Sequence, residues 1–394
     1  MKSDQASFDE IIDRRGTGCD KWDEMPRKLG VSKDDGIPMW VADMDFRPPE
    51  AVNDALRALM AHGIYGYHGD ESSYLDAIRW WMSERHDWEV AREHIFTAHG
   101  LVNGTALCVD AFTDPGDGIV LLTPIYHAFF RILNAADREI VECPMPIRDG
   151  RYVLDFDAMD ARMTGREKML IFCSPHNPAG RVWTREELEG VAEFARRHDL
   201  ILVSDEIHHD LVMPGHRHIP FAHLDDISDR LIMLTAATKT FNLAGAHTGN
   251  VIIADPDLRA RFAKRKKALA ISAGLFGIRV VEAAYSPEGA EWVDRLQVYL
   301  DGNRRLFEEG LNALPGIQVM PLEATYLAWA DFSGTGMTSE EVRNRVYGEA
   351  RLAPSAGETF GTGGEGFLRF NIATQRSRIR EAVARLGAAF GDLQ

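Results

Sequence analysis

The sequence predicts an α/β protein in which a large domain with a mostly parallel sheet is accompanied by a smaller α+β domain. In the middle of the chain, short apolar segments alternate with amphipathic ones, as they do in βαβ units. After Ser286 and Pro287 the pattern changes to one long helical segment followed by short strands. The 394 residues are enough for two or three domains with sizeable cores.

The first 47 residues are predicted to form an irregular arm, which ends at the two prolines of residues 48–49. A helix is expected over residues 50–62, because apolar residues recur at helical spacing from Val52 to Leu59. A second helix is expected over residues 72–85.

The large domain is predicted from its strands and the helices between them. The strands are short apolar runs at residues 119–122, 139–143, 169–173, 200–204, 231–235 and 250–254. The helices are expected at residues 100–112, 126–134 and 185–198. The last helix has a capping box, in which Thr184 and Glu187 each satisfy a free N–H of the first turn. A ligand site is expected at the C-terminal ends of these parallel strands.

The smaller domain is predicted from the last third of the chain. A long helix is expected over residues 288–314, and a later helix is capped by Thr338 and Glu341. The expected strands lie at residues 317–320, 325–331 and 366–371. The predicted domains therefore span residues 48–285 and, joined by the N-terminal arm, residues 1–47 with 286–394.

Composition excludes several classes of partner. The net charge of −16 disfavours nucleic acid, and the basic segment at residues 261–267 is interpreted as a solvated helix face. Cys19, Cys108, Cys143 and Cys173 form no C-x-x-C pair, so neither a metal site nor a disulfide framework is expected. The sequence has no signal-like apolar core and no apolar stretch of about 18 residues, so we expect a cytoplasmic protein with no membrane partner.

Lys239 is the first candidate for chemistry, since it follows the apolar run of residues 231–235 directly after small and hydroxylated residues. A lysine just beyond a buried strand is poorly solvated, which lowers its pKa and suits a Schiff-base lysine. The alternative is a lysine that extends to solvent from a strand end.

Asp205 is the second candidate, because it follows a buried strand and a carboxylate there needs a positive partner or several hydrogen bonds. It could be the counter-ion of a protonated ring nitrogen, or simply a helix cap. Asn177, held between two nearby prolines, could present its amide to a ligand oxygen. Gly100 at a helix start could leave N–H groups free for a phosphate. The segments around Asn177 and Gly100 could each also be a plain turn.

Taken in order along the chain, these segments resemble fold type I pyridoxal-phosphate enzymes, and most closely the cystathionine β-lyase or C–S lyase branch called the MalY/PatB family. The resemblance covers nearly the whole chain. The segments that carry it are Phe8-Asp-Glu-Ile-Ile-Asp-Arg-Arg-Gly-Thr17, Ala42-Asp-Met-Asp-Phe46, Gly63-Ile-Tyr-Gly-Tyr67, Thr123-Pro-Ile-Tyr-His-Ala-Phe129, Ser204-Asp-Glu-Ile-His208 and Thr325-Tyr-Leu-Ala-Trp329.

The resemblance implies roles for five residues around the cofactor ring of pyridoxal 5'-phosphate. Lys239 would hold the cofactor covalently and act as the general base. Asp205 would keep the pyridine nitrogen protonated, and Asn177 would bind the phenolic oxygen of the ring, a task that His208 is placed to share. Tyr126 would stack on the ring face and is counted among the catalytic residues.

The phosphate contacts implied by the resemblance are less complete. Gly100 and Leu101 match its backbone donors. Many relatives carry a serine three residues before the lysine and an arginine eight residues after it, where this chain has Ala236 and His247. The side chains that could replace them are His99, Thr238, Thr240 and His247.

The resemblance also implies substrate and subunit contacts. Arg369 would bind the α-carboxylate of an amino-acid substrate bidentately, and Tyr326 and Asn177 are further substrate contacts. Specificity is expected from side chains such as Trp22, Met44 and Tyr326. Tyr67 matches a tyrosine that reaches the phosphate of the neighbouring subunit, which implies a homodimer.

The implied activity is C–S β-lyase, in which cystathionine or a cysteine S-conjugate undergoes α,β-elimination to a thiol, pyruvate and ammonia. An aminotransferase of class I/II is the alternative, because both reactions proceed through the same carbanion. A ligand-sensing regulator without catalysis is a third reading, which the acidic charge and the early start of the enzyme-like pattern disfavour. The leaving group stays open.

Overall fold

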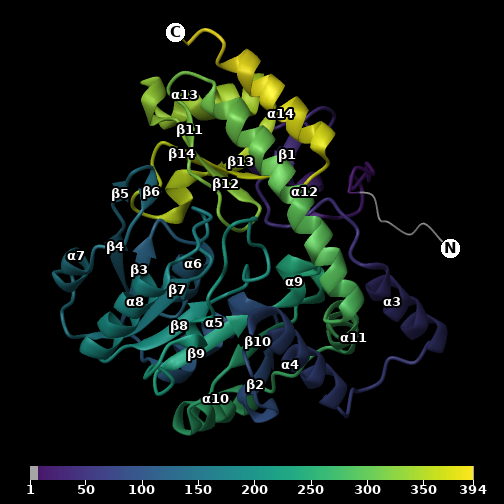
Figure 1. The fold of residues 1–394 in the computed structure, drawn as a ribbon, viewed down its shortest axis with the longest axis vertical. Helices are drawn as coiled ribbons and strands as arrows, with labels where there is room; N and C mark the ends of the chain where they lie inside the picture. The colour runs from purple at the N-terminus through teal and green to yellow at the C-terminus, as the bar shows by residue number, and fades with distance from the viewer. Residues whose placement is uncertain (1–7, 394) are drawn as a thin grey trace.

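The computed structural model describes residues 8–393, and a seven-stranded sheet forms its larger part (Figure 1). The strand order is β2-β10-β9-β8-β7-β3-β4. All ladders are parallel except those of β10, which runs antiparallel to β9 and β2. The strands are β2 (Ile95–Ala98), β3 (Gly118–Thr123), β4 (Glu139–Pro144), β7 (Glu167–Cys173), β8 (Ile201–Asp205), β9 (Leu231–Thr235) and β10 (Gly249–Ile252). The predicted α/β class with a mostly parallel sheet is confirmed.

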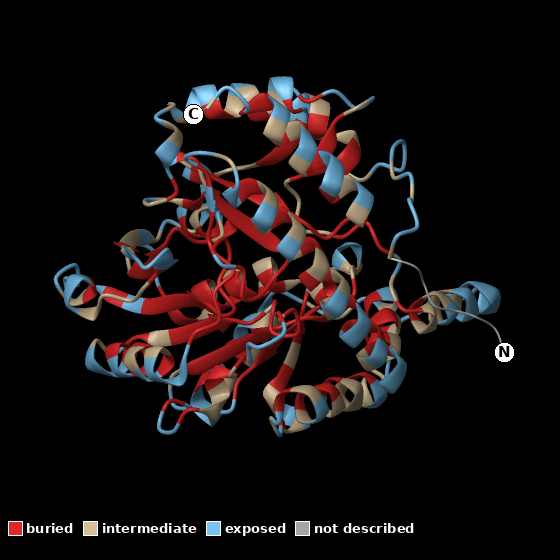
Figure 2. Cartoon of the chain, turned by 45° about the horizontal axis from the view of Figure 1, so that its top comes forward, coloured by how far each residue is buried: buried red, intermediate tan, exposed pale blue. Residues whose placement is uncertain are grey.

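Helices cover both faces of this sheet, so β3, β9 and β10 are buried along their whole length (Figure 2). Alternate strand residues enter two different cores, because successive side chains point to opposite faces. Leu234 packs with α5, α6 and α10, whereas Met233 packs in the core that holds α4 and α8. The helices are α3 (Glu50–His62), α4 (Ser72–His86), α5 (Leu101–Phe112), α6 (Ala128–Ala135), α7 (Phe156–Asp160), α8 (Arg185–Arg197), α9 (Ala237–Thr240), α10 (Pro256–Ala268) and α11 (Leu275–Ala284).

A second, five-stranded sheet has the order β1-β13-β14-β12-β11. It joins residues from both ends of the chain, since β1 pairs in parallel with β13 while the other ladders are antiparallel. Its strands are β1 (Ile37–Met39), β11 (Gln318–Val319), β12 (Leu327–Asp331), β13 (Leu352–Ala356) and β14 (Phe367–Asn371). The sheet order supports our two-domain division, which remains a proposal.

The long helix α12 (Pro287–Asn312) runs from beside α11 to the smaller sheet and packs against α14 (Arg376–Ala389) (Figure 1). Both predicted capping boxes are present, at α8 and at α13 (Ser339–Arg343). The remaining short α-helices and β-strands are α1 (Asp20–Asp23), α2 (Met25–Leu29), β5 (Ile147–Arg148) and β6 (Arg151–Tyr152).

One smaller expectation is confirmed, since the basic segment at residues 261–267 forms a solvated helix face. The basic segment lies on α10, where the guanidinium of Arg265 pairs with Asp110. Cys108, Cys143 and Cys173 are buried, and all four cysteines are free thiols. No helix within residues 8–393 has both the length and the apolar character needed to span a membrane.

Candidate active site

A cavity of about 480 Å³ lies where the parallel strands of the large sheet end. The segments that follow β2, β3, β7, β8 and β9 all contribute to its wall, together with Ala42 from the N-terminal part. Its lining residues are Ala42, His99, Gly100, Leu101, Val102, Asn103, Ala106, Tyr126, Arg131, Ile132, Cys173, Asn177, Asp205, Ile207, His208, Thr238, Lys239, Ala244 and His247. Topology therefore brings together ten of the sequence-predicted site residues.

Lys239 is carried by α9, a single helical turn that follows β9 almost at once. Its Nζ donates a hydrogen bond to the Ala42 carbonyl oxygen at 2.7 Å. Burial lowers the pKa of Lys239 to about 8, because the cavity wall solvates an ammonium poorly. Near neutral pH an appreciable fraction of this amine is therefore uncharged and able to act as a nucleophile or base.

Asp205 is the last residue of β8 and lines the same cavity. Burial raises the pKa of Asp205 to about 7, although the Ile207 backbone N–H donates to Oδ1 at 3.1 Å and lowers it. The positive charges of Lys239 and His209 act in the same lowering direction. A cation placed against this carboxylate would keep it ionised, as a protonated ring nitrogen would do.

His208 also lines the cavity, and burial lowers its pKa well below the usual value, so the ring is neutral. Its Nδ1 has no hydrogen-bond partner among the described residues. The ring of Tyr326 lies 6.0 Å from that of His208, and its hydroxyl donates to the Ala42 carbonyl at 2.9 Å. Tyr326 is thus held at the same acceptor as Lys239, although it is not among the cavity-lining residues.

Asn177 and Arg369 are linked, since the Arg369 guanidinium donates to Asn177 Oδ1 at 2.8 Å. This bond uses the amide oxygen of Asn177 and leaves its Nδ2 to donate to a ligand. Arg369 also donates to the Trp40 carbonyl at 2.9 Å and stacks 4.7 Å from the Phe360 ring centre. Its Nε is buried without a partner in the described chain, and burial lowers the pKa of Arg369 to about 10. An incoming carboxylate would satisfy that N–H.

The predicted phosphate end is built around the start of α5. Gly100 has a φ of 80°, which other residues adopt at a cost, and its cap position leaves the first N–H groups of α5 free. Thr238 and His247 line the same cavity. Thr240 does not, because its hydroxyl donates to Asp210 instead, so its suggested phosphate role is wrong.

The aromatic candidates differ in position. Tyr126 lines the cavity, and burial raises the pKa of its hydroxyl, which keeps the ring neutral. Tyr67 is fully exposed, so within one chain it does not reach the cavity. Its predicted contact is with a neighbouring subunit and stays a prediction.

The prediction that Trp22 and Met44 shape the cavity is wrong. Met44 is fully buried in the main core, and Trp22 is buried with its indole N–H bonded to Asp45. Ala42 and Arg131, by contrast, line the cavity without having been predicted. Ala42 acts through its backbone carbonyl, which no side-chain pattern reveals. Arg131 lies on α6, five residues after Tyr126, which matches neither the i+3 nor the i+4 spacing of neighbours on a helix face, so no sequence pattern indicated it.

The arrangement fits pyridoxal phosphate in each of its chemical parts. Lys239 offers an amine for the aldehyde, and Asp205 offers a carboxylate for a protonated ring nitrogen. The start of α5 offers backbone donors for a phosphate. The unpartnered Nδ1 of His208 and Nε of Arg369 are unsatisfied groups of the kind that a bound ligand resolves.

Comparison with known proteins supports the same reading. The family model described as aminotransferase class I and II matches residues 36–386. Cystathionine beta-lyase PatB of Bacillus subtilis is 38% identical, over 97% of this chain and 99% of its own. Cystalysin from Treponema denticola, whose crystal structure contains a pyridoxal 5'-phosphate cofactor, has a TM-score of 0.93 and 35% identity, over 98% and 99%. The PLP-bound C–S lyase from Staphylococcus hominis has a TM-score of 0.89 and 31% identity, over 98% and 99%.

Proposed function

Because this chain belongs to the aminotransferase class I and II family, we propose that it is a pyridoxal 5'-phosphate-dependent carbon–sulfur β-lyase. It converts cystathionine or cysteine S-conjugates, with water, into a thiol, pyruvate and ammonia. The observation that carries the proposal is the buried Lys239 amine in one cavity with Asp205 and Asn177. The full-length similarity to PatB selects the lyase reaction from those that such a site permits.

When bound, pyridoxal phosphate supplies an electron sink that stabilises negative charge at the substrate α-carbon. Arg369 binds the α-carboxylate and, through Asn177 Oδ1, orients the amide that holds the cofactor ring. Lys239, whose pKa burial lowers to about 8, would take the α-proton in its uncharged form and return a proton to the departing sulfur. Asp205 keeps its negative charge against the ring nitrogen, and His208 stays neutral beside it.

The competing activity is transamination, which needs the same residues up to removal of the α-proton. One observation concerns both reactions: Arg131 is an exposed cation in the cavity wall, where a distal substrate carboxylate would meet it. Both cystathionine and a dicarboxylic amino acid carry such a group, so Arg131 favours neither reaction over the other.

The test is incubation of purified enzyme with cystathionine, in the absence of any 2-oxo acid, followed by assay of pyruvate and free thiol. We expect equimolar pyruvate and thiol over many turnovers, and none from Lys239→Ala. Turnover that appears only after a 2-oxo acid is added would establish the aminotransferase instead.

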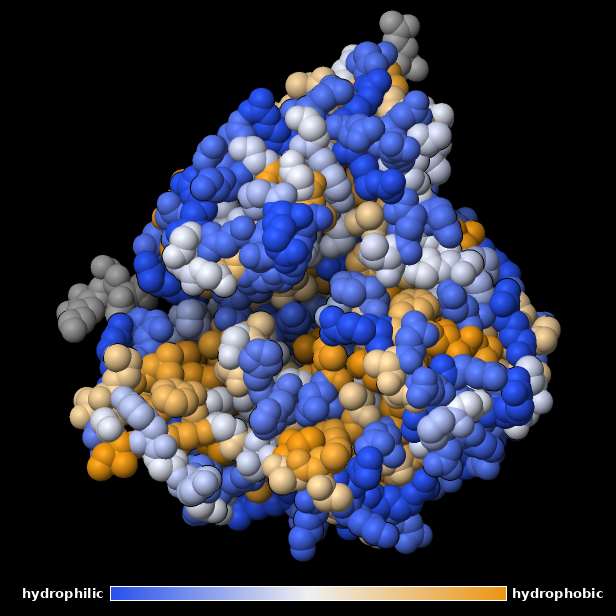
Figure 3. Space-filling view, turned by 180° about the vertical axis from the view of Figure 1, so that it is seen from behind, coloured by the Kyte–Doolittle hydropathy of each residue, from blue (hydrophilic) through white to orange (hydrophobic). Residues whose placement is uncertain are grey.

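The enzyme is further proposed to be a homodimer in which Tyr67 completes the site of the neighbouring subunit. Supporting this, large apolar side chains are exposed along residues 60–67, and Tyr65 lies 5.5 Å from the exposed Phe276 of α11. Figure 3 shows apolar side chains gathered over the lower part of one face of the molecule. An exposed apolar surface of this kind is typical of an interface. The four free thiols support a cytoplasmic location.

A further inference from the structure

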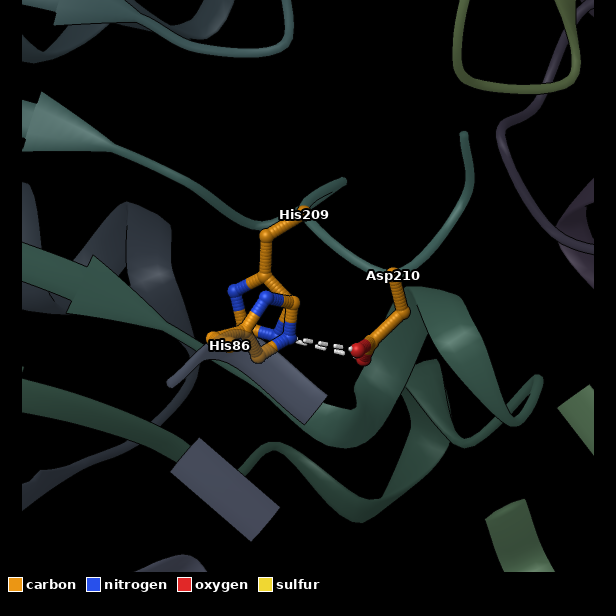
Figure 4. Close-up of side chains that lie close together, drawn as sticks. All are labelled: His86, His209 and Asp210. Carbon is orange, nitrogen blue, oxygen red and sulfur yellow. Dashed lines mark hydrogen bonds and ion pairs between the residues drawn. The ribbon is translucent and has the colours of Figure 1, made fainter. Parts of the chain in front are cut away.

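A second group of buried titratable side chains lies beside the active-site cavity, directly after His208 in the chain. His86 from α4, His209 and Asp210 are all buried, and the two imidazole rings lie 4.3 Å apart with both Nε2 atoms facing the Asp210 carboxylate (Figure 4). None of the three lines the cavity, and none has a part in the mechanism above. Burial of ionisable groups costs folding free energy unless they are paired, so the presence of this cluster requires an explanation.

The Asp210 carboxylate is the centre of the cluster, and each of its oxygens has two partners. Oδ1 accepts from Trp81 Nε1 at 3.0 Å and bonds His86 Nε2 at 2.8 Å. Oδ2 accepts the Thr240 hydroxyl at 2.7 Å and forms an ion pair with His209 Nε2 at 3.1 Å. Four side chains from three separate parts of the chain are thereby tied to one carboxylate.

The charges in the cluster are also balanced. Burial would raise the pKa of Asp210, but the charge of His209, whose Nε2 lies 3.1 Å from Oδ2, and the hydrogen bond with His86 hold it well below the usual value. Burial would lower the pKa of His209, yet the Asp210 charge raises it overall. Burial lowers the pKa of His86 to about 4, so His86 is neutral. The cluster therefore combines a close His209–Asp210 contact, in which the Asp210 charge favours protonated His209, with a neutral His86.

The same three residues could in principle hold a metal ion, since they offer ligand atoms within 4.8 Å of one another. Their bonding argues against that role. Both Asp210 oxygens already accept side-chain hydrogen bonds, from the Trp81 indole N–H and from the Thr240 hydroxyl. The hydrogen bonds of the cluster satisfy the carboxylate without a cation.

The bond to Thr240 gives the cluster its significance, because Thr240 follows Lys239 on the same helical turn. With four residues, α9 is too short to be stable by its own hydrogen bonds. Its position must come from tertiary anchors. The backbone of Asp210 is itself fixed, since Gln297 of α12 donates to its carbonyl at 2.6 Å.

We propose that Asp210, held by His86 and His209, is a positioning residue that fixes Lys239 through the Thr240 hydroxyl. It connects the turn that carries the amine to the segment that carries Asp205 and His208, so the two sides of the cavity keep their relative placement. A buried ion pair is a poor source of stability compared with apolar packing, which fits a role in geometry. The inference rests on the role proposed for Lys239.

The test compares two substitutions of Thr240, one that removes its hydroxyl and one that keeps it. Thr240→Val removes the hydroxyl and nearly keeps the shape, whereas Thr240→Ser keeps the hydroxyl. Phe194→Leu removes buried apolar volume from α8, which neither lines the cavity nor contacts Asp210, and serves as the control for lost stability. Apo-protein is mixed with pyridoxal phosphate, its attachment is followed by absorbance, and kcat and KM are then measured per bound cofactor.

For Thr240→Val we expect the attachment rate and kcat each to fall at least about tenfold with KM nearly unchanged, because a small displacement of the amine slows its reactions. Thr240→Ser should remain near wild type, and Phe194→Leu should lose thermal stability but keep its kcat. Should Thr240→Val fail to fold, Thr240→Ala replaces it with the same expectation.

The inference is overturned if Thr240→Val loses thermal stability but keeps both rates, which would make the cluster merely structural. It is also overturned if purified protein holds stoichiometric zinc whose removal causes the same losses. Attachment of the cofactor needs no substrate. It therefore tests this inference even if the wild type forms no pyruvate, an outcome that would contradict the proposed reaction alone.

Discussion

At the scale of single residues, the site depends on two opposite consequences of burial. Desolvation lowers the pKa of Lys239 to about 8 and raises that of Asp205 to about 7. The first change makes the amine reactive near neutral pH. The second means that the Asp205 carboxylate stays ionised near neutral pH only when a cation lies beside it. A cofactor that carries both an aldehyde and a basic ring nitrogen would react with the Lys239 amine and would supply the cation beside Asp205.

The lowered pKa of Lys239 predicts a pH dependence for cofactor attachment to apo-protein. Only the neutral amine attacks an aldehyde, so the rate should rise with pH through about 8 and then level off. An ordinary lysine would continue to gain reactivity up to about pH 10. Stopped-flow absorbance across this range measures the midpoint.

Asp205→Asn provides the matched control, because the Asp205 charge raises the pKa of Lys239. Its removal should move the midpoint to lower pH. A wild-type rate that still climbs steeply at pH 10, or a midpoint that rises in Asp205→Asn, would show that desolvation does not control this amine.

Sequence patterns indicated individual residues well where the chemistry lies in a side chain beside a strand end. Lys239, Asp205 and Asn177 each follow a predicted strand, and parallel topology places them in one cavity. Ala42 could not be found this way, since its carbonyl oxygen is the functional group. Thr240 was misplaced because the hydroxyls of neighbouring threonines on one turn point in different directions, and only Thr238 faces the cavity.

At the scale of elements, prediction succeeded where the periodicity and the caps were strong. The capping boxes of α8 and α13 are each set by two residues close in sequence, so they could be identified before any tertiary contact was known. β1 and β13 were not predicted. Each contains a proline, which weakens a strand pattern, and each is ordered by pairing with the other.

The short helix α9 is a second element that sequence patterns could not predict. Four residues carry no helical periodicity, so only tertiary contacts such as the Thr240–Asp210 bond define this turn. The element that holds Lys239 is therefore among those that sequence patterns describe least, although Lys239 itself was the first residue that they indicated.

At the scale of the whole molecule, the proposed homodimer makes a prediction about mixed subunits. Tyr67→Ala and Lys239→Ala homodimers should each be strongly impaired, because each lacks one component of every site. A heterodimer would contain one site with both Tyr67 and Lys239. Random subunit exchange should therefore restore about a quarter of wild-type activity per site.

Subunit exchange after mild denaturation, followed by the pyruvate assay, measures this recovery, and light scattering measures the mass. A monomer in solution would contradict the proposal, as would a Tyr67→Ala dimer with full activity. Mixtures that stay as inactive as their parents would show that Tyr67 acts within its own chain.

The central claim is that Lys239 binds the cofactor covalently, and borohydride reduction tests it most directly. Reduced holoenzyme is digested with trypsin and analysed by mass spectrometry. We predict a pyridoxyl phosphate group on Lys239, within a peptide that spans residues 231–259 because the modified lysine is no longer cleaved. An adduct on another lysine, or none on a protein that binds the cofactor, would contradict the account.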